Sequence, residues 1–66
     1  MRVALNGAER EVPDGTTVLA LLEQAGIDRR RVAVEVNREV VPKTRHGERL
    51  LAPGDRVEIV TMVGGG

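Results

Sequence analysis

The 66-residue chain contains no phenylalanine, tyrosine, tryptophan or cysteine. A chain of this length buries only about 60% of the surface that it exposes when unfolded. Its core must therefore be built economically from aliphatic side chains, without a disulfide to support it. Aromatic side chains also provide the stacking platforms for single-stranded nucleic acids, and thiolates bind metals and act as nucleophiles. The composition therefore disfavours all of these functions.

The charges of the chain cancel, because ten basic residues balance ten acidic ones. Proteins that bind DNA or RNA depend on positive charge, so we expect no nucleic-acid partner. The longest apolar run, residues 18–22, is too short to span a membrane, and residues 1–11 lack the apolar segment of a signal peptide. With no cysteine present, these features favour a cytoplasmic protein without a bound metal or cofactor.

The first part of the chain predicts a β-hairpin followed by a helix. Apolar side chains alternate along residues 1–5, Asn6-Gly7 is a strong hairpin-turn signal, and residues 9–12 form the polar return strand. After a turn at residues 13–15, Thr17 is suited to be the N-cap of a helix of about nine residues, which Gly26 ends. Four apolar side chains recur at helical spacing: Val18, Leu21, Leu22 and Ala25.

The second part predicts three further strands, at residues 32–36, 40–41 and 57–62. Residues 43–48 form a polar loop between them, in which we expect His46 to be solvated. A hairpin, a crossing helix and further strands are typical of the α+β class, and in this order they describe the β-grasp, or ubiquitin-like, fold. We therefore expect a mixed sheet of four to five strands with one main helix on one face. The domain would comprise residues 1–63, with residues 64–66 as a flexible C-terminal glycine tail.

The end of the chain combines this last strand with three glycines, Gly64, Gly65 and Gly66. Glycine costs more conformational entropy to order than any other residue, so the glycines are either a disordered end or a working part. A C-terminal glycine offers its α-carboxylate, which becomes a good electrophile only after activation, most simply as an acyl-adenylate made with ATP. Because glycine has no Cβ, such a tail can enter a narrow channel in an activating enzyme.

The alternation of the last strand also predicts an exposed apolar patch. If Val57 and Ile59 face the core, Val60 and Met62 cannot. We expect Val60 and Met62, together with Val63, to dock on a partner, although a loop that covers them is an alternative.

Several motifs give the chain a resemblance to the ThiS family, the ubiquitin-like sulfur carriers of thiamine biosynthesis. These motifs are Asn6-Gly7, Asp14-Gly15-Thr16-Thr17-Val18 with Leu21-Leu22, Val32-Ala33-Val34-Glu35-Val36-Asn37, Val40-Val41-Pro42, Gly54-Asp55-Arg56-Val57-Glu58-Ile59-Val60 and Val63-Gly64-Gly65-Gly66. The resemblance implies that a ThiF-like adenylyltransferase uses ATP and Mg²⁺ to adenylate the carboxylate of Gly66. Sulfur from a cysteine desulfurase relay then replaces AMP, and the resulting thiocarboxylate donates sulfur to the thiazole synthase ThiG.

Other functions stay open at this point. The chain could be a MoaD-like or other ThiS-like carrier for a different product, or a non-covalent β-grasp adaptor that uses its exposed sheet face. A protein modifier is disfavoured weakly, because Lys43 is the only lysine. We find no residue set that could run catalysis alone, so we expect a monomeric carrier that partner enzymes modify. The basic run Arg29-Arg30-Arg31 is interpreted as a solvated connection.

Overall fold

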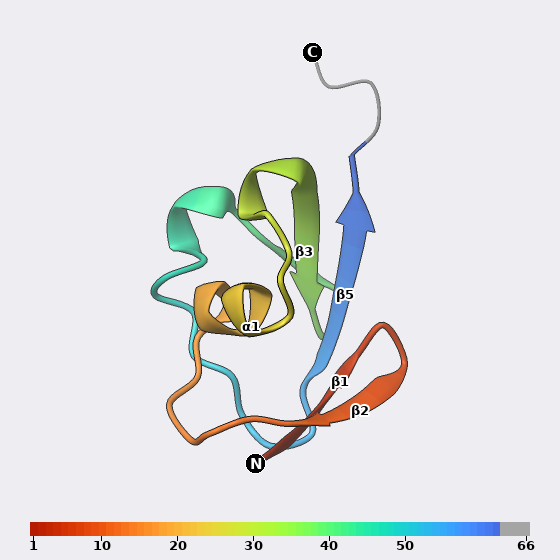
Figure 1. Ribbon diagram of the computed structural model, residues 1–66, viewed down its shortest axis with the longest axis vertical. Helices are drawn as coiled ribbons and strands as arrows, with labels where there is room; N and C mark the ends of the chain where they lie inside the picture. Colours follow the sequence, from red (N-terminus) through yellow and green to blue (C-terminus); the bar gives the residue numbers. More distant parts are fainter. Residues whose placement is uncertain (63–66) are drawn as a thin grey trace.

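The computed structural model describes residues 1–62, which form a five-stranded sheet with a helix on one face (Figure 1). The elements in chain order are β1 (Arg2–Leu5), β2 (Ala8–Glu11), α1 (Val18–Gln24), the 3₁₀ turn η1 (Arg29–Arg31), β3 (Val32–Val36), β4 (Glu39–Val41), the 3₁₀ turn η2 (Lys43–Arg45) and β5 (Arg56–Thr61). The strand order is β2-β1-β5-β3-β4, and only the β1–β5 pair is parallel. The predicted α+β arrangement is confirmed, with the first and last strands adjacent at the centre of the sheet.

The β1–β2 hairpin turns at Asn6 and Gly7, as predicted. Their φ angles of 48° and 84° are both positive, as a two-residue turn that follows the twist of the strands requires. Asn6 has a second role that the sequence did not reveal. Its side-chain amide accepts a hydrogen bond from the Ile59 N–H (2.7 Å) and donates one to the Ile59 carbonyl (3.2 Å). Asn6 therefore extends the β1–β5 ladder beyond the end of β1.

Helix α1 begins and ends where the sequence predicts. Thr17 is the N-cap, and its hydroxyl oxygen accepts a hydrogen bond from the backbone N–H of Ala20 (3.1 Å). At the other end Gly26 has a φ of 72°, and the next residue, Ile27, donates its N–H to the Leu22 carbonyl (2.9 Å). This is the Schellman arrangement of a glycine-terminated helix. With only seven residues, α1 depends on packing against the sheet.

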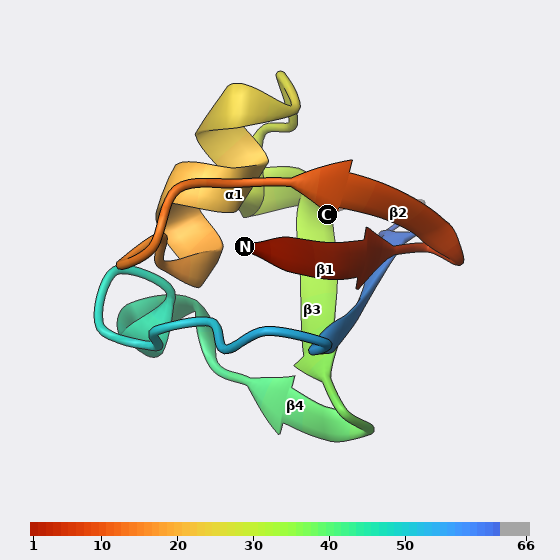
Figure 2. The same cartoon turned by 90° about the horizontal axis from the view of Figure 1, so that it is seen from below.

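The core lies between α1 and the sheet, and every buried apolar residue in the described part of the chain is aliphatic (Figure 2). Half-buried Met1, Leu5, Ile27 and Ile59 pack around it. The buried side chains are Val3, Val12, Val18, Leu21, Leu22, Val32, Val34, Val36, Val41, Leu51 and Val57. The core therefore has the composition that the absence of aromatic residues demands. No helix within residues 1–62 has the length and apolar character needed to cross a membrane.

His46 contradicts the prediction from sequence, which treated it as a solvated loop residue. Its side chain is completely buried, and its Nε2 lies 3.0 Å from the carbonyl oxygen of Val41. Its own carbonyl accepts the N–H of Leu19 (2.8 Å), one of the donors in the first turn of α1 that has no partner within the helix. The prediction was wrong because η2 folds the polar segment back beneath the start of α1. His46 thus connects the end of β4 to that helix.

A second buried polar group supports the start of β5. Asp55 is 8% exposed, and its carboxylate accepts hydrogen bonds from the Ala52 N–H (2.8 Å) and the Asn37 side-chain amide (3.0 Å). The Asn37 side chain also accepts the N–H of Arg56 (2.9 Å). These contacts give the Gly54-Asp55 turn a structural role, because they fix the position from which β5 starts.

Candidate functional site

The candidate site lies at the end of β5 that precedes the C-terminal segment. β5 runs between β1 and β3, and its pairing with the β3 side continues to the last described residue, because the Met62 N–H donates to the Arg31 carbonyl (2.8 Å). The ribbon shows this end of β5 beside η1, at the opposite end of the molecule from the N-terminus (Figure 1). The remaining predicted site residues, Val63, Gly64, Gly65 and Gly66, lie outside the described residues.

Val60 and Met62 are exposed on the face of the sheet that α1 does not cover. The exposed fractions are 59% for Val60 and 47% for Met62, whereas Val57 on the opposite face is completely buried. No loop covers these two side chains in the described part of the chain, so the alternative of core packing is wrong. That Val60, Met62 and Val63 dock on a partner stays a prediction.

Two residues that the sequence interpretation missed join this surface. Ala33 of β3 is exposed and stands directly opposite Val60 in the β3–β5 register. Val40 of β4 is 69% exposed. The signal for Val40 was available in principle, because Val41 beside it faces the core and strand neighbours alternate. We call Ala33, Val40, Val60 and Met62 the sheet patch.

A shallow hollow of about 140 Å³ adjoins the sheet patch. Val40, Pro42 and Met62 contribute to its walls, with Lys43 at its margin and His46 buried among its lining residues. The lining is almost wholly apolar, so the hollow suits an aliphatic side chain of a partner protein better than a charged ligand. The sheet patch therefore combines an apolar surface with an adjoining hollow that a side chain could enter.

Charged residues of η1 stand next to the sheet patch. The pKa of the Asp28 carboxyl is held below its usual range, first by the side-chain hydrogen bond from Arg30 and then by that residue's backbone N–H. The same contact raises the pKa of the Arg30 guanidinium. Arg29 and Arg31 complete the basic run, and Lys43 donates from Nζ to the Arg30 carbonyl (2.8 Å). The run is solvated, as expected, but it is not remote from the site.

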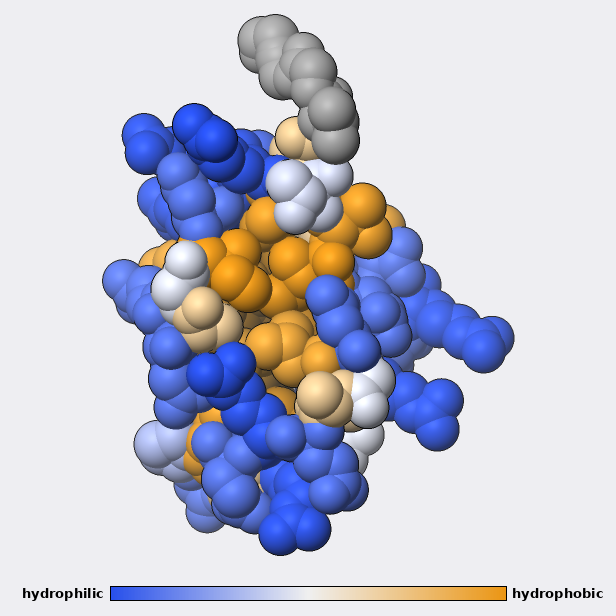
Figure 3. Space-filling view, turned by 45° about the vertical axis from the view of Figure 1, so that its right-hand side comes forward, coloured by the Kyte–Doolittle hydropathy of each residue, from blue (hydrophilic) through white to orange (hydrophobic). Residues whose placement is uncertain are grey.

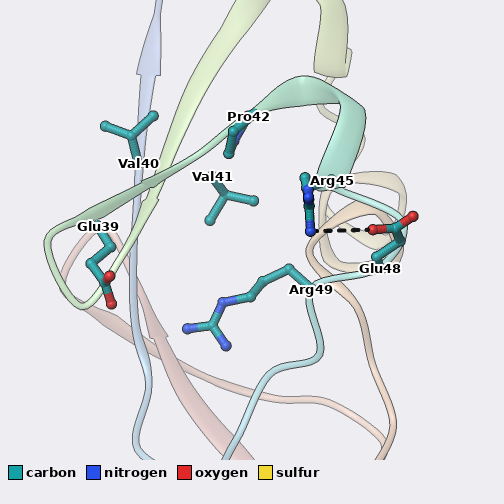
Figure 4. A pocket seen from close by; sticks show the side chains of 7 residues that line it. All are labelled: Glu39, Val40, Val41, Pro42, Arg45, Glu48 and Arg49. Atoms are coloured by element: carbon teal, nitrogen blue, oxygen red, sulfur yellow. Dashed lines mark ion pairs between the residues drawn. The ribbon is translucent and has the colours of Figure 1, made fainter.

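The larger hollow along β4 offers no chemistry of its own. It measures about 420 Å³ and is bordered by Val41, Arg45, Arg49, Glu39 and Glu48 among others (Figure 4). Two arginines and two glutamates compensate each other there, and Arg45 already pairs with Glu48 at 3.9 Å. Within residues 1–62 there is also no group of three or more His, Cys, Asp or Glu side chains that could hold a metal ion. Among the described residues the sheet patch is thus the stronger candidate for a functional site, and its role in docking stays a prediction.

Comparisons with known proteins identify the family of this chain. The model of the ThiS family matches residues 3–66. The chain belongs to the ThiS family. A sulfur carrier protein ThiS from Thermus thermophilus is 38% identical over 97% of this chain and 98% of its own length. A crystal structure of the thiamine biosynthesis protein ThiS from Geobacter metallireducens superposes with a TM-score of 0.86 at 29% identity and covers all of both chains. The predicted β-grasp fold is thereby confirmed.

One ThiS-like relative is a much longer protein. A thiazole synthase from Paramagnetospirillum magneticum is 46% identical over the whole of this chain. The chain spans only 20% of that protein's length. ThiS-like sequence therefore occurs both as a small protein and within a long polypeptide.

Proposed function

We propose that this chain is a sulfur carrier of thiamine biosynthesis that works through the carboxylate of Gly66. The observation that carries the proposal is the exposed sheet patch in a chain of the ThiS family, because two of its members, Val60 and Met62, lie directly before residues 63–66. A carrier needs a surface by which enzymes recognise it and an end that reaches their active sites. β5 combines the two, because one strand bears Val60 and leads directly into the C-terminal segment.

The proposed chemistry takes place in partner enzymes. A ThiF-like adenylyltransferase docks on the sheet patch and receives Gly64, Gly65 and Gly66 in a narrow channel. A carboxylate oxygen of Gly66 attacks the α-phosphorus of ATP with Mg²⁺ present, and pyrophosphate leaves. The outer sulfur of a persulfide on a cysteine desulfurase relay then attacks the acyl carbon and AMP leaves. A thiol reduces the resulting acyl disulfide and releases the thiocarboxylate. The carrier is a co-substrate in this scheme, and we propose that it acts in the cytoplasm as a monomer.

We propose a thiazole synthase, ThiG, as the acceptor of the sulfur. The support comes from the relative in Paramagnetospirillum magneticum, in which a segment similar to this chain is part of a protein named thiazole synthase. Joining a carrier to its acceptor in one polypeptide raises the effective concentration of one for the other. A carrier that is not joined to its acceptor must instead bind each enzyme transiently through the sheet patch. We expect such interfaces to be at the small end of the size range of protein–protein interfaces.

Mass spectrometry of the intact protein and its fragments tests the proposal. The chain ending at Gly66 is incubated with ATP, Mg²⁺, a ThiF-like enzyme and a sulfur source, with a sample that lacks ATP as control. Replacement of one oxygen by sulfur changes the mass almost as much as oxidation of a methionine does, so the shifted fragment must exclude Met1 and Met62. We expect an ATP-dependent shift confined to Gly66 that disappears when Gly66 is deleted.

A non-covalent adaptor is the second candidate, because the sheet patch would also suit a binding module. The two functions respond differently to the same variants. Deleting Gly66, or adding one residue after it, abolishes the activity of a carrier and leaves an adaptor unaffected. Val60→Asp impairs both. If an adenylyltransferase that is active on another ThiS protein produces no adenylate or thiocarboxylate here, the carrier proposal fails and the adaptor is favoured.

A further inference from the structure

The charges of this chain cancel in number but are separated in space. Four basic residues lie at the end of the molecule where β5 finishes, and we call them the tail-end basic cluster: Arg29, Arg30, Arg31 and Lys43. Two hydrogen bonds of 2.8 Å hold this cluster together and against β5, from Lys43 Nζ to the Arg30 carbonyl and from the Met62 N–H to the Arg31 carbonyl. Figure 3 shows strongly hydrophilic side chains gathered at this end of the molecule.

The cluster makes the chain electrically asymmetric. Asp28 is the acidic side chain that pairs with this group, so four basic side chains and one carboxylate leave a surplus of three positive side-chain charges among the described residues there. Because the whole chain has ten basic and ten acidic residues, the other six basic and nine acidic residues carry a surplus of three negative charges. A molecule with no net charge but with separated positive and negative ends is oriented by the electric field of a charged partner, although its net charge produces no attraction.

The fold uses little of this positive charge. The side chains of Arg30 and Arg31 are 85% and 80% exposed, and within residues 1–62 both pair only with Asp28, at 3.2 Å and 4.0 Å. Arg29 is exposed and forms no ion pair with any residue in the range 1–62. Exposed ion pairs of this kind contribute little to stability. The positive charge is therefore available to a partner at the end of the molecule where the C-terminal segment begins.

We propose that the tail-end basic cluster steers this chain, C-terminal segment first, onto an acidic surface around the tail-entry channel of the ThiF-like adenylyltransferase. This inference rests on the proposed function, which requires that end of β5 to face the enzyme. Nucleic acid is the less suitable partner, because the surplus of negative charge over the rest of the chain would be repelled by its phosphates. Charges at the rim of an interface act mainly on the rate of association and on its dependence on salt.

Two matched double variants test the steering. Arg29→Gln with Arg31→Gln removes two charges from the cluster and leaves Arg30 on Asp28. Arg38→Gln with Arg56→Gln removes two exposed charges from the opposite end of the sheet, where β3 turns into β4 and β5 begins. Association with the adenylyltransferase is followed by stopped flow at about 10 mM and about 1 M ionic strength, where the Debye length is about 30 Å and 3 Å. Adenylation at saturating carrier is measured in parallel.

We expect the cluster variant to associate about three- to tenfold more slowly than wild type at low salt and equally fast at high salt. Its dissociation rate and its maximal rate of adenylation should match wild type, and the control variant should associate as wild type does. The inference is overturned if both variants associate equally slowly, or if the cluster variant associates as fast as wild type. In either case adenylation of the wild-type chain would still support the proposed function. A wild-type chain that neither binds the enzyme nor is adenylated would overturn both.

Discussion

His46 should be essential to the stability of this domain, although it lies in a segment of polar sequence. Its side chain is completely buried, and its Nε2 forms a 3.0 Å hydrogen bond with the Val41 carbonyl. His46→Ala removes this bond and leaves a buried carbonyl short of a donor, which costs about 1–3 kcal/mol. The cavity adds to that cost, since truncation of large buried side chains to alanine costs about 2–5 kcal/mol. Together the two costs amount to a loss of roughly 3–8 kcal/mol.

Such a loss is large for this protein. At about 0.05–0.15 kcal/mol per residue, 66 residues provide a free energy of unfolding of roughly 3–10 kcal/mol. Two further substitutions separate the cost of the lost hydrogen bond from the cost of the cavity. His46→Leu keeps most of the volume and loses the hydrogen bond, but it also removes the buried Nδ1, which has no partner among the described residues. We therefore expect a loss of only about 1–2 kcal/mol. His46→Gln places an amide nitrogen where Nε2 was and keeps a donor for Val41, so it should be the mildest of the three.

Urea denaturation followed by far-ultraviolet circular dichroism measures these differences, because the chain has no tryptophan to report by fluorescence. Arg45→Ala serves as the control, since Arg45 is 69% exposed and Glu48 is its one ion-pair partner among the described residues. It should stay within about 0.5 kcal/mol of wild type. The reasoning is refuted if all three His46 variants are as stable as this control, or if leucine is as costly as alanine.

Three other substitutions test separate features of the structure. Asn6→Ala removes both hydrogen bonds to Ile59, so we expect the free energy of unfolding to fall by about 1–2 kcal/mol and hydrogen exchange at the Ile59 amide to become faster. Unchanged exchange would contradict the proposed role of these two bonds, which we call the Asn6 clamp. The contacts with Arg30 lower the pKa of Asp28, so the Asp28 carboxylate contributes its full stabilisation above the ordinary pKa of aspartate and loses it as the pH falls through the lowered pKa. Arg30→Gln should raise the pKa of Asp28 in an NMR titration. An unchanged pKa would argue against the contact. Val60→Asp should leave the free energy of unfolding within about 0.5 kcal/mol of wild type and weaken binding to the adenylyltransferase at least about tenfold in a titration. Binding as tight as that of wild type would exclude the sheet patch as the docking surface.

The sequence was sufficient wherever structure depends on a few neighbouring residues. The Asn6-Gly7 turn, the Thr17 cap and the Gly26 helix end follow from local backbone chemistry, and all three are found where predicted. The exposure of Val60 and Met62 follows from the period of a strand, once one face of β5 is assigned to the core.

The sequence failed where distant segments meet. The burial of His46 depends on how η2 folds beneath α1, and polar neighbours on both sides conceal it. Ala33 and Val40 join the sheet patch only because of the register between β3 and its two neighbours. The hydrogen bonds of Asn6 span 53 residues, which no local pattern can indicate. Each of these contacts is set by tertiary packing, to which local patterns in a single sequence do not respond.

The clamp formed by Asn6 has a mechanical consequence. β1 and β5 are parallel neighbours, so a pull on the end of β5 against a body held by the hairpin would load their hydrogen bonds in shear. Bonds loaded in shear share the force and yield together, whereas bonds opened from one end yield one after another. Asn6 adds two bonds to that shared set, at the position closest to the pulled end. An enzyme that draws the C-terminal segment into its channel would then pull on a domain that resists as a unit.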